Sequence, residues 1–156
     1  MDDRQFTIST IMEPKLANAF GSIHGGEVMK MMDTTAGCTA IRYVRGNVVT
    51  ARADELQFIK PVHIGDYVTC IGKVVYVGRT SIEIFVTVDI EDLRVPGSSS
   101  RALEAYFTMV ALDENGRPTP IREYEPITDE EKKLYEHVSV RREFDKARRK
   151  KPENDQ

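Results

Sequence analysis

The stretch from Asn18 to Gly37 constrains the fold more than any other part of this 156-residue chain. It begins as a loop of small residues, tightens through the Gly25-Gly26 pair, and continues with helical periodicity. Small or apolar side chains recur at the spacing of one helix face, at Val28, Met31, Met32, Thr35, Ala36 and Thr39. After Lys30 the opposite side carries one charged residue, Asp33. A helix that is apolar nearly all round is predicted to be buried.

Asp33 is therefore the unusual residue of this helix. Its neighbours one turn away on the same ridge are Met29 and Gly37. A carboxylate removed from water must be paired with hydrogen-bond donors or cations. Bonding to nearby hydroxyl groups or to a buried arginine would make its role structural. A catalytic role is equally compatible, because costly buried carboxylates gather at functional sites.

Length and composition indicate a single globular domain spanning residues 1–156. Hydrophobic residues make up 40% of the chain and charged residues 30%, as in ordinary soluble proteins. The first residues lack the basic start and apolar core of a signal peptide. No apolar run approaches the ~20 residues that cross a membrane. We therefore expect a cytoplasmic protein without membrane contact, with Cys38 and Cys70 as thiols rather than a disulfide.

Alternation and turn signals predict five strands and a second helix. The strands are expected at residues 5–12, 48–59, 67–77, 80–90 and 102–112. A capping box at Thr128 to Glu131 begins a C-terminal helix that runs to about Arg149, beyond a core of about residues 5–125. No alternation of strands with helices appears, so the sheet should be antiparallel and the class α+β. One long buried helix and one such sheet suggest that the sheet curls around the helix.

The C-terminal helix ends in a basic run from Arg141 to Lys151, with seven basic residues against Glu143 and Asp145. Such a run is able to contact phosphate groups of nucleic acid or of a nucleotide-bearing molecule. More often it is the solvated end of a helix, where cations suit the dipole. We expect no nucleic-acid partner, since no helix-turn-helix segment precedes the domain.

Four blocks of sequence resemble one known family. The pattern Asn-x-x-Gly-x-x-His-Gly-Gly-x-x-Met-x-x-Met-Asp begins at Asn18 and ends at Asp33. Blocks at residues 58–66, 77–81 and 104–118 follow in the same order. Together they resemble the hotdog-fold acyl-CoA thioesterases, and in particular the bacterial acyl-CoA hydrolases related to the animal cytosolic (brain-type) acyl-CoA hydrolase.

The resemblance implies a hotdog fold, in which an antiparallel sheet wraps around a long central helix. It also implies hydrolysis of a fatty acyl-CoA to a free fatty acid and coenzyme A, with Asn18 and Asp33 as the functional pair. Coenzyme A is then part of the substrate, and no separate cofactor is expected. The hairpin residues Gly78, Arg79, Thr80 and Ser81 are expected to contact coenzyme A phosphates. Such proteins commonly form homodimers that assemble into trimers of dimers.

The chemistry of thioester hydrolysis assigns further roles. Backbone amides at the helix start, above all that of Gly26, are suited to stabilise an oxyanion. Asp33 would act as general base or as nucleophile. The two are seven residues apart, which is about 10 Å along one helix. A reacting carbon lies about 3 Å from both groups, so we expect the site to combine two subunits. His24 should hold the helix start, with direct chemistry as the alternative.

Two other functions stay open at this point. A hotdog dehydratase or hydratase would use His24 as base against a carbon acid. A non-enzymatic protein of this fold would bind acyl-CoA as a sensor. No spacing of Cys, His or carboxylate residues suggests a metal site. The acyl chain length, any regulation by nucleotides and the role of the basic C-terminal helix do not follow from the sequence.

Overall fold

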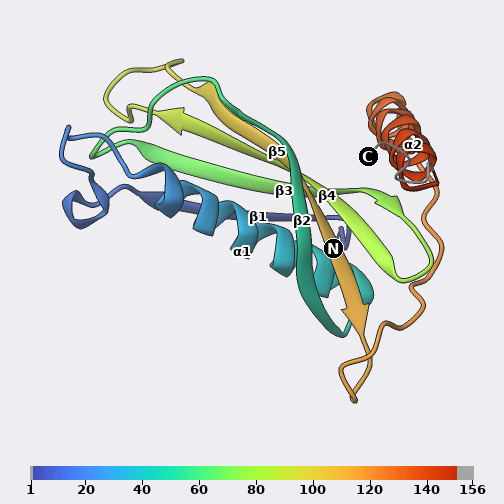
Figure 1. The fold of residues 1–156 in the computed structure, drawn as a ribbon. Coiled ribbons are helices and arrows are strands. Elements are labelled where there is room, and N and C mark those ends of the chain that lie inside the picture. Colours follow the sequence, from blue (N-terminus) through green and yellow to red (C-terminus); the bar gives the residue numbers. More distant parts are fainter. Residues whose placement is uncertain (1, 151–156) are drawn as a thin grey trace, which may run out of the picture.

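The computed structural model describes residues 2–150, which form five strands and two α-helices (Figure 1). The elements are β1 (Gln5–Ile11), the 3-10 turn η1 (Pro14–Leu16), α1 (Gly25–Val44), β2 (Asn47–Phe58), β3 (Tyr67–Val77), β4 (Ser81–Glu91), β5 (Ser100–Leu112) and α2 (Asp129–Arg149). The strand and α2 bounds agree with the expected ones to within two residues. The α+β class is therefore confirmed.

The strands form one antiparallel sheet in the order β1-β3-β4-β5-β2. The sheet curves around α1, which packs against all five strands on its concave side (Figure 1). This arrangement confirms the expected helix wrapped by a curled sheet. Because β1 and β2 are the two edges, each has one side without a strand partner among residues 2–150.

The main core lies between α1 and the sheet. Ile82, Ile84, Val86 and Val88 of β4 are all fully buried there, as their alternation predicts. Helix and sheet meet closely at Gly72 of β3. A Cβ atom at this position would lie 2.2 Å from Thr39 Oγ1, so only glycine fits beneath the helix.

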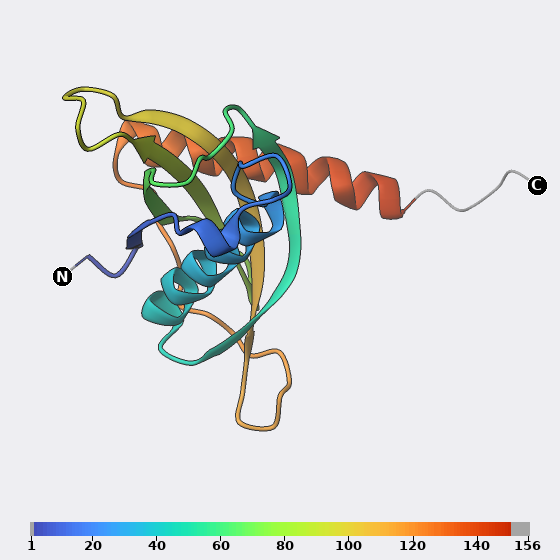
Figure 2. The same cartoon turned by 90° about the vertical axis from the view of Figure 1, so that its left-hand side faces the viewer.

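The C-terminal helix α2 lies on the opposite side of the sheet from α1 (Figure 2). Val138 of α2 packs with Val75 and Tyr106 in a second, smaller core. The helix also covers the polar face of β4, which leaves the Glu83 side chain 1% exposed. Glu83 is thus a polar residue that becomes buried because α2, which follows much later in the chain, covers it.

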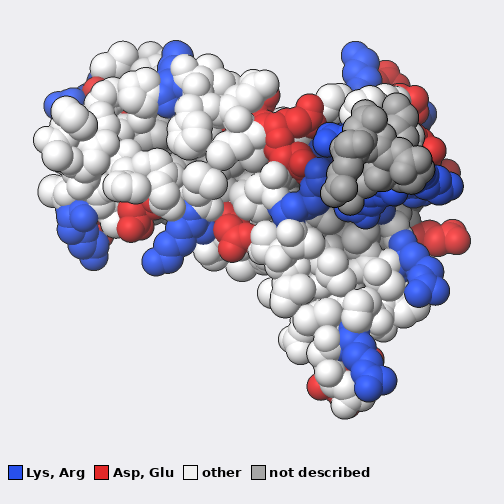
Figure 3. Space-filling model, in the orientation of Figure 1, with Lys and Arg blue, Asp and Glu red and all other residues white. Residues whose placement is uncertain are grey.

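One expectation about α1 is wrong for the single chain. The helix is not buried all round, because the sheet covers one side of it and leaves a ridge exposed. The exposed residues of that ridge are Met29, Lys30, Asp33, Thr34 and Ile41. The unpaired edge of β2 also exposes apolar side chains, including Val49 and Phe58. In Figure 3, separate charged groups lie along the edge formed by α1, whereas charged side chains are densest around α2.

Candidate active site

The loop before α1 is built around the side chain of Asn18. Its Oδ1 accepts hydrogen bonds from the backbone N–H of Phe20 at 2.9 Å and of Ser22 at 3.3 Å. The Asn18 N–H donates to Ser22 O at 2.7 Å, and Gly21 closes the turn with φ +81°. Because the oxygen of the side-chain amide is used within the loop, the NH₂ group is the part left for a ligand.

The N-terminus of α1 is capped by His24. Its Nδ1 accepts a hydrogen bond from the backbone N–H of Gly26 at 3.0 Å. This geometry agrees with the expected positional role of His24. The His24 ring also occupies the Gly26 amide that was expected to stabilise the oxyanion, so use of this N–H requires the ring to give up the bond. Among residues 2–150 no acceptor bonds the N–H of Gly25.

Asp33 lies two turns further along α1, on the exposed ridge. Thr50 of the edge strand β2 donates a hydrogen bond from Oγ1 to Asp33 Oδ1 across 2.6 Å. Met109 Sδ of the neighbouring strand β5 lies 3.3 Å from the same hydroxyl. The carboxylate is therefore fixed by a hydroxyl group on the adjoining strand.

A groove of about 410 Å³ lies beside the helix start. Asn18 and Gly25 line it together with the ring of Phe58 and other mostly apolar side chains. Neither Gly26 nor Asp33 is among the lining residues. Within one chain the structure thus brings together the Asn18 loop and the start of α1, and it leaves Asp33 outside this groove.

The hairpin between β3 and β4 holds the four residues expected to contact coenzyme A phosphates. Gly78 N–H donates to Ser81 O at 2.8 Å and closes the turn. The carbonyl groups of Arg79 and Thr80 accept bonds from later parts of the chain. Arg142 of α2 approaches Ser81 Oγ at 3.4 Å, so α2 and this hairpin are in direct contact.

Thr50 is the site residue that sequence reasoning missed. It stands in the apolar start of β2, where a threonine is an ordinary strand residue. Its pairing with Asp33 depends on how an edge strand crosses a helix, and no local pattern encodes that. One indication was present in the sequence: a carboxylate on this helix requires a hydrogen-bond donor, and a hydroxyl group is able to supply it.

Residues 2–150 contain no group of three or more His, Cys, Asp or Glu side chains able to hold a metal ion. In the same part of the chain, neither helix combines the length and apolar character needed to span a bilayer.

A curved antiparallel sheet around one long central helix defines the hotdog fold. In this chain the exposed ridge of that helix carries the carboxylate of Asp33. The family model described as "Thioesterase superfamily" matches residues 20–96. The cytosolic acyl coenzyme A thioester hydrolase of Rattus norvegicus is 35% identical over 134 residues, which cover 85% of this chain and 35% of that protein. The chain thus spans about a third of that relative.

Two solved structures are similar over nearly the whole chain. An apo-hexameric acyl-CoA thioesterase is 36% identical with a TM-score of 0.87, covering 94% of this chain and 93% of that one. An acyl-CoA hydrolase of Staphylococcus aureus, solved with butyryl coenzyme A and coenzyme A, is 32% identical with a TM-score of 0.85, covering 93% and 88%. The chain therefore belongs to the thioesterase superfamily, as a homologue of the acyl-CoA thioester hydrolases.

Proposed function

We propose that this protein is a cytoplasmic acyl-CoA thioesterase that hydrolyses fatty acyl-CoA at sites shared between two subunits. The observation that carries the proposal is the Asp33–Thr50 pair on the exposed ridge of α1, in which a hydroxyl of the neighbouring strand holds one oxygen of the carboxylate. Membership of the family and the names of its relatives support the reaction. A relative named as cytosolic supports the location.

Two copies of the chain complete the site if their β2 edges pair around a two-fold axis. Such a dimer is isologous, and antiparallel pairing sets the first half of one β2 against the second half of the other. Thr50 lies in the first half of the strand and Phe58 at its end, beside Gly25. Pairing therefore brings Asp33 and Thr50 of one subunit toward the Asn18 groove of its partner. The apolar side chains that this face exposes, among them Met29, Val49 and Phe58, support the pairing.

The chemistry then divides between the subunits. An amide at the start of α1, from Gly25 or Gly26, stabilises the oxyanion of the thioester carbonyl. The NH₂ group of Asn18 donates to the same oxygen or to the attacking water. Asp33 of the other subunit accepts a proton from that water, whose oxygen bonds to the carbonyl carbon. The C–S bond breaks and the coenzyme A sulfur leaves as a thiol, taking the proton that Asp33 accepted from the water. Direct attack by the carboxylate is the alternative route.

Variants of the Staphylococcus aureus relative support this choice of residues. Solved structures of that enzyme carry an alanine in place of an asparagine, an aspartate and a threonine. The three changed positions are spaced 15 and 17 residues apart, the same intervals that separate Asn18, Asp33 and Thr50. The spacing supports Thr50 as the third member of the site.

The hairpin of Gly78 to Ser81 is proposed to contact the coenzyme A phosphates. Thr50 pairs with Met109, which pairs with Ile82, the residue after Ser81. The end of the hairpin therefore lies two strand spacings, about 10 Å, from Thr50. The nucleotide end of the substrate then lies on the Asp33 side of the shared site. We also propose that the dimers assemble into trimers of dimers, as the name of a hexameric relative supports.

The test is thiol release from an acyl-CoA series, from acetyl to palmitoyl, by the wild type and by Asp33→Asn. We expect turnover in the wild type and a loss of about 10²-fold in kcat in the variant. The chain-length profile of the wild type names the substrate class. No thiol release from any acyl-CoA, with coenzyme A still bound, would reject the enzyme and leave an acyl-CoA sensor. Release of water from a hydroxyacyl-CoA without free thiol would instead identify a dehydratase.

A further inference from the structure

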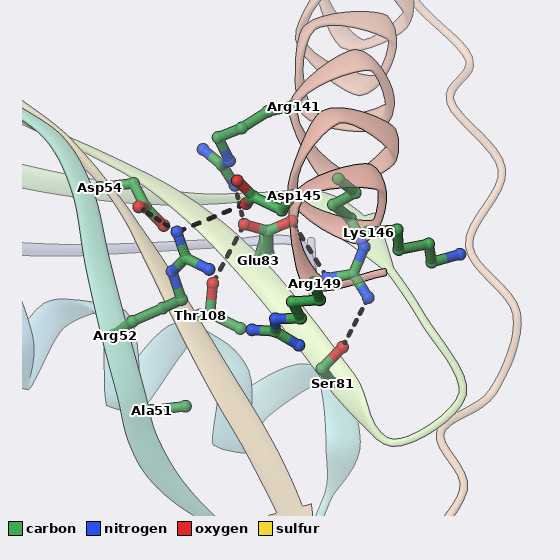
Figure 4. Close-up of a pocket in the computed structure, with 11 residues that line it drawn as sticks. Ala51, Arg52, Asp54, Ser81, Glu83, Thr108, Arg141, Asp145, Lys146 and Arg149 are labelled. Atoms are coloured by element: carbon green, nitrogen blue, oxygen red, sulfur yellow. Dashed lines mark hydrogen bonds and ion pairs between the residues drawn. The ribbon is translucent and has the colours of Figure 1, made fainter. Parts of the chain in front are cut away.

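The edge strand β2 changes the face of the sheet to which its side chains point. Thr50 lies on the inner side, where its hydroxyl bonds Asp33 of α1. Two residues later, Arg52 lies on the outer side, where its Nη2 is 3.4 Å from Asp145 Oδ2 of α2 (Figure 4). Residues two apart in a regular strand share one face. The strand must therefore be irregular between Thr50 and Arg52.

Two β-bulges produce this change of face. From Thr50 to Arg52, β2 advances by two residues while its partner β5 advances by one. From Asp54 to Gln57, β2 advances by three residues while β5 advances by two. Each bulge adds one residue to β2, and the side chains beyond it point to the other face. Residues 52–55 form a stretch between the bulges that faces α2, which we call the outward segment.

Beyond the outward segment the side chains return to the inner side of the sheet. Leu56 packs against the main core. The ring of Phe58 lies against Gly25 at the start of α1, where a Cβ atom would be 3.3 Å from Phe58 Cε1. The outward segment thus separates Thr50 from Phe58. These are the two ends of β2 that the proposed two-fold pairing brings together in one site.

The second bulge contains Glu55, whose backbone is in the left-handed region with φ +52°. Glycine adopts this conformation readily, and bulges with a left-handed residue prefer it. A residue with a Cβ atom persists there only when the surrounding structure imposes the conformation, and such residues gather at functional sites. Contacts outside the strand must therefore hold Glu55.

Helix α2 supplies these contacts. His137 Nε2 lies 2.9 Å from Glu55 Oε2, and Arg141 Nη1 donates to the same oxygen at 3.2 Å. Both partners are themselves fixed. The His137 ring stacks on Tyr106, with centroids 5.4 Å apart, and Arg141 also bonds the buried carboxylate of Glu83. We call the contact of Glu55 with His137 and Arg141 the Glu55 clamp.

We propose that Glu55 is a positioning residue of the active site, held by α2 so that β2 bulges and presents Thr50 and Phe58 to the inner side of the sheet. Thr50 orients Asp33, and Phe58 lines the groove that Asn18 also lines. This role, which rests on the proposed function, lets the C-terminal helix act on the site through the sheet, from the face opposite α1.

The first test compares alanine with glycine at position 55. Both changes remove the carboxylate and its bonds to α2, but glycine adopts the left-handed conformation without strain. We expect kcat for acyl-CoA hydrolysis to fall about tenfold in Glu55→Ala and to be about fivefold higher in Glu55→Gly than in Glu55→Ala. The proteins are assayed where light scattering gives the wild-type mass. Equal kcat values for the two variants, low or normal, would overturn the proposal.

Arg45→Ala and Arg45→Gly are the matched controls. Arg45 also has a positive φ, +59°, but it lies at the end of α1 and outside β2. Glycine should give a higher Tm than alanine there, because it relieves the same kind of backbone strain, while kcat stays at the wild-type value. An alanine-to-glycine difference in kcat as large at Arg45 as at Glu55 would indicate general stability and reject the positioning role.

His137→Phe tests the Glu55 clamp from the side of α2. Phenylalanine keeps a ring against Tyr106 and removes the bond to Glu55. We expect kcat to fall about threefold in the wild-type background. In the Glu55→Gly background the same change should leave kcat unaltered, because no bond remains to be lost. An effect of equal size in both backgrounds, or none in either, would overturn the clamp.

Hydrogen exchange of the amides of residues 49–58 gives a readout that needs no turnover. Exchange should be faster in Glu55→Ala than in Glu55→Gly, because a strained strand without its clamp opens more often. A wild type that releases no thiol while its variants show this difference rejects the proposed function, and with it the catalytic role of Glu55. Normal thiol release without the difference in exchange rejects the clamp and leaves the thioesterase.

Discussion

Thr50 Oγ1 donates a hydrogen bond to Asp33 Oδ1 across 2.6 Å and so ties the edge strand β2 to the exposed ridge of α1. Within residues 2–150 no hydrogen bond engages the second oxygen, Oδ2. One oxygen of the carboxylate is thus fixed within the chain, and the other is left for a water or a substrate. This division suits a group that must keep one orientation while it accepts a proton.

Replacing Thr50 by valine should slow catalysis without unfolding the protein. The change keeps the shape of the side chain and removes the donor to Asp33, so the carboxylate loses its fixed orientation. We expect kcat to fall about tenfold while the KM for acyl-CoA changes little, as measured by thiol release. Thr69→Val is the matched control, because within residues 2–150 the Thr69 hydroxyl on β3 bonds only Ser9 Oγ on β1, which donates to it at 3.2 Å. Equal kcat values for wild type and Thr50→Val would remove Thr50 from the site.

Two inactive variants should restore activity when combined in one dimer. If Asn18 and Asp33 act from different subunits, a dimer of Asn18→Ala and Asp33→Ala chains holds one intact site and one doubly altered site. Random assembly of co-expressed chains then regains about a quarter of wild-type activity. The control is co-expression of each variant with itself, which should stay inactive. A mixture as inactive as its parents would place both residues in one chain.

Much of the fold followed from the sequence because its signals are local. Alternation in β4 and the glycine turn after β3 depend on neighbouring residues. The capping box at Thr128 is present as expected, with Glu131 as its second partner. Such features act within a few residues, so pattern reading located nearly every boundary of the strands and of α2.

What the sequence missed depends on contacts between distant segments. The apolar pattern of α1 did not predict its exposed ridge. An apolar helix face looks the same in the sequence whether it is buried within its own chain or covered by a second subunit. The partners of Asp33 and Glu83 come from segments 17 and 58 residues away. Their pairing depends on how strands and helices cross. Asn18, His24, Gly26 and Asp33 stay predictions as catalytic groups, although His24 caps the helix as the sequence suggested.

Alanine at Gly72 should destabilise the fold. Its Cβ would lie 2.2 Å from Thr39 Oγ1 and 3.3 Å from Thr35 O, so helix α1 must shift away from β3. We expect a loss of about 1–3 kcal/mol in the free energy of unfolding, measured by urea denaturation. Adding Thr39→Ala removes the closest atom and should recover part of the loss. The control is Gly46→Ala, whose nearest atom lies at 3.8 Å. A Gly72→Ala protein as stable as this control would contradict the close packing.

Acid should loosen α2 through Glu131. Burial works to raise the pKa of this carboxyl group, but hydrogen bonds from the backbone N–H groups of Ile127 and Thr128, with the charge of Arg4, outweigh it and hold the pKa below its ordinary 4.5. A depressed pKa in the folded state means that stabilisation is complete above about pH 4.5 and is lost as the pH falls through the folded value.

Glu131→Gln isolates this charge, because glutamine retains a capping box. We expect the variant to be less stable than the wild type by about 0.5–1 kcal/mol at pH 7, with a difference that shrinks toward zero near pH 3, measured by urea denaturation at both values. Glu130→Gln is the control, since the one ion pair of Glu130 among the described residues 2–150 is a surface pair with Lys73 at 3.4 Å. The prediction fails if Glu131→Gln keeps the same deficit at pH 3 as at pH 7, because the lost stability would then not come from the ionised carboxylate.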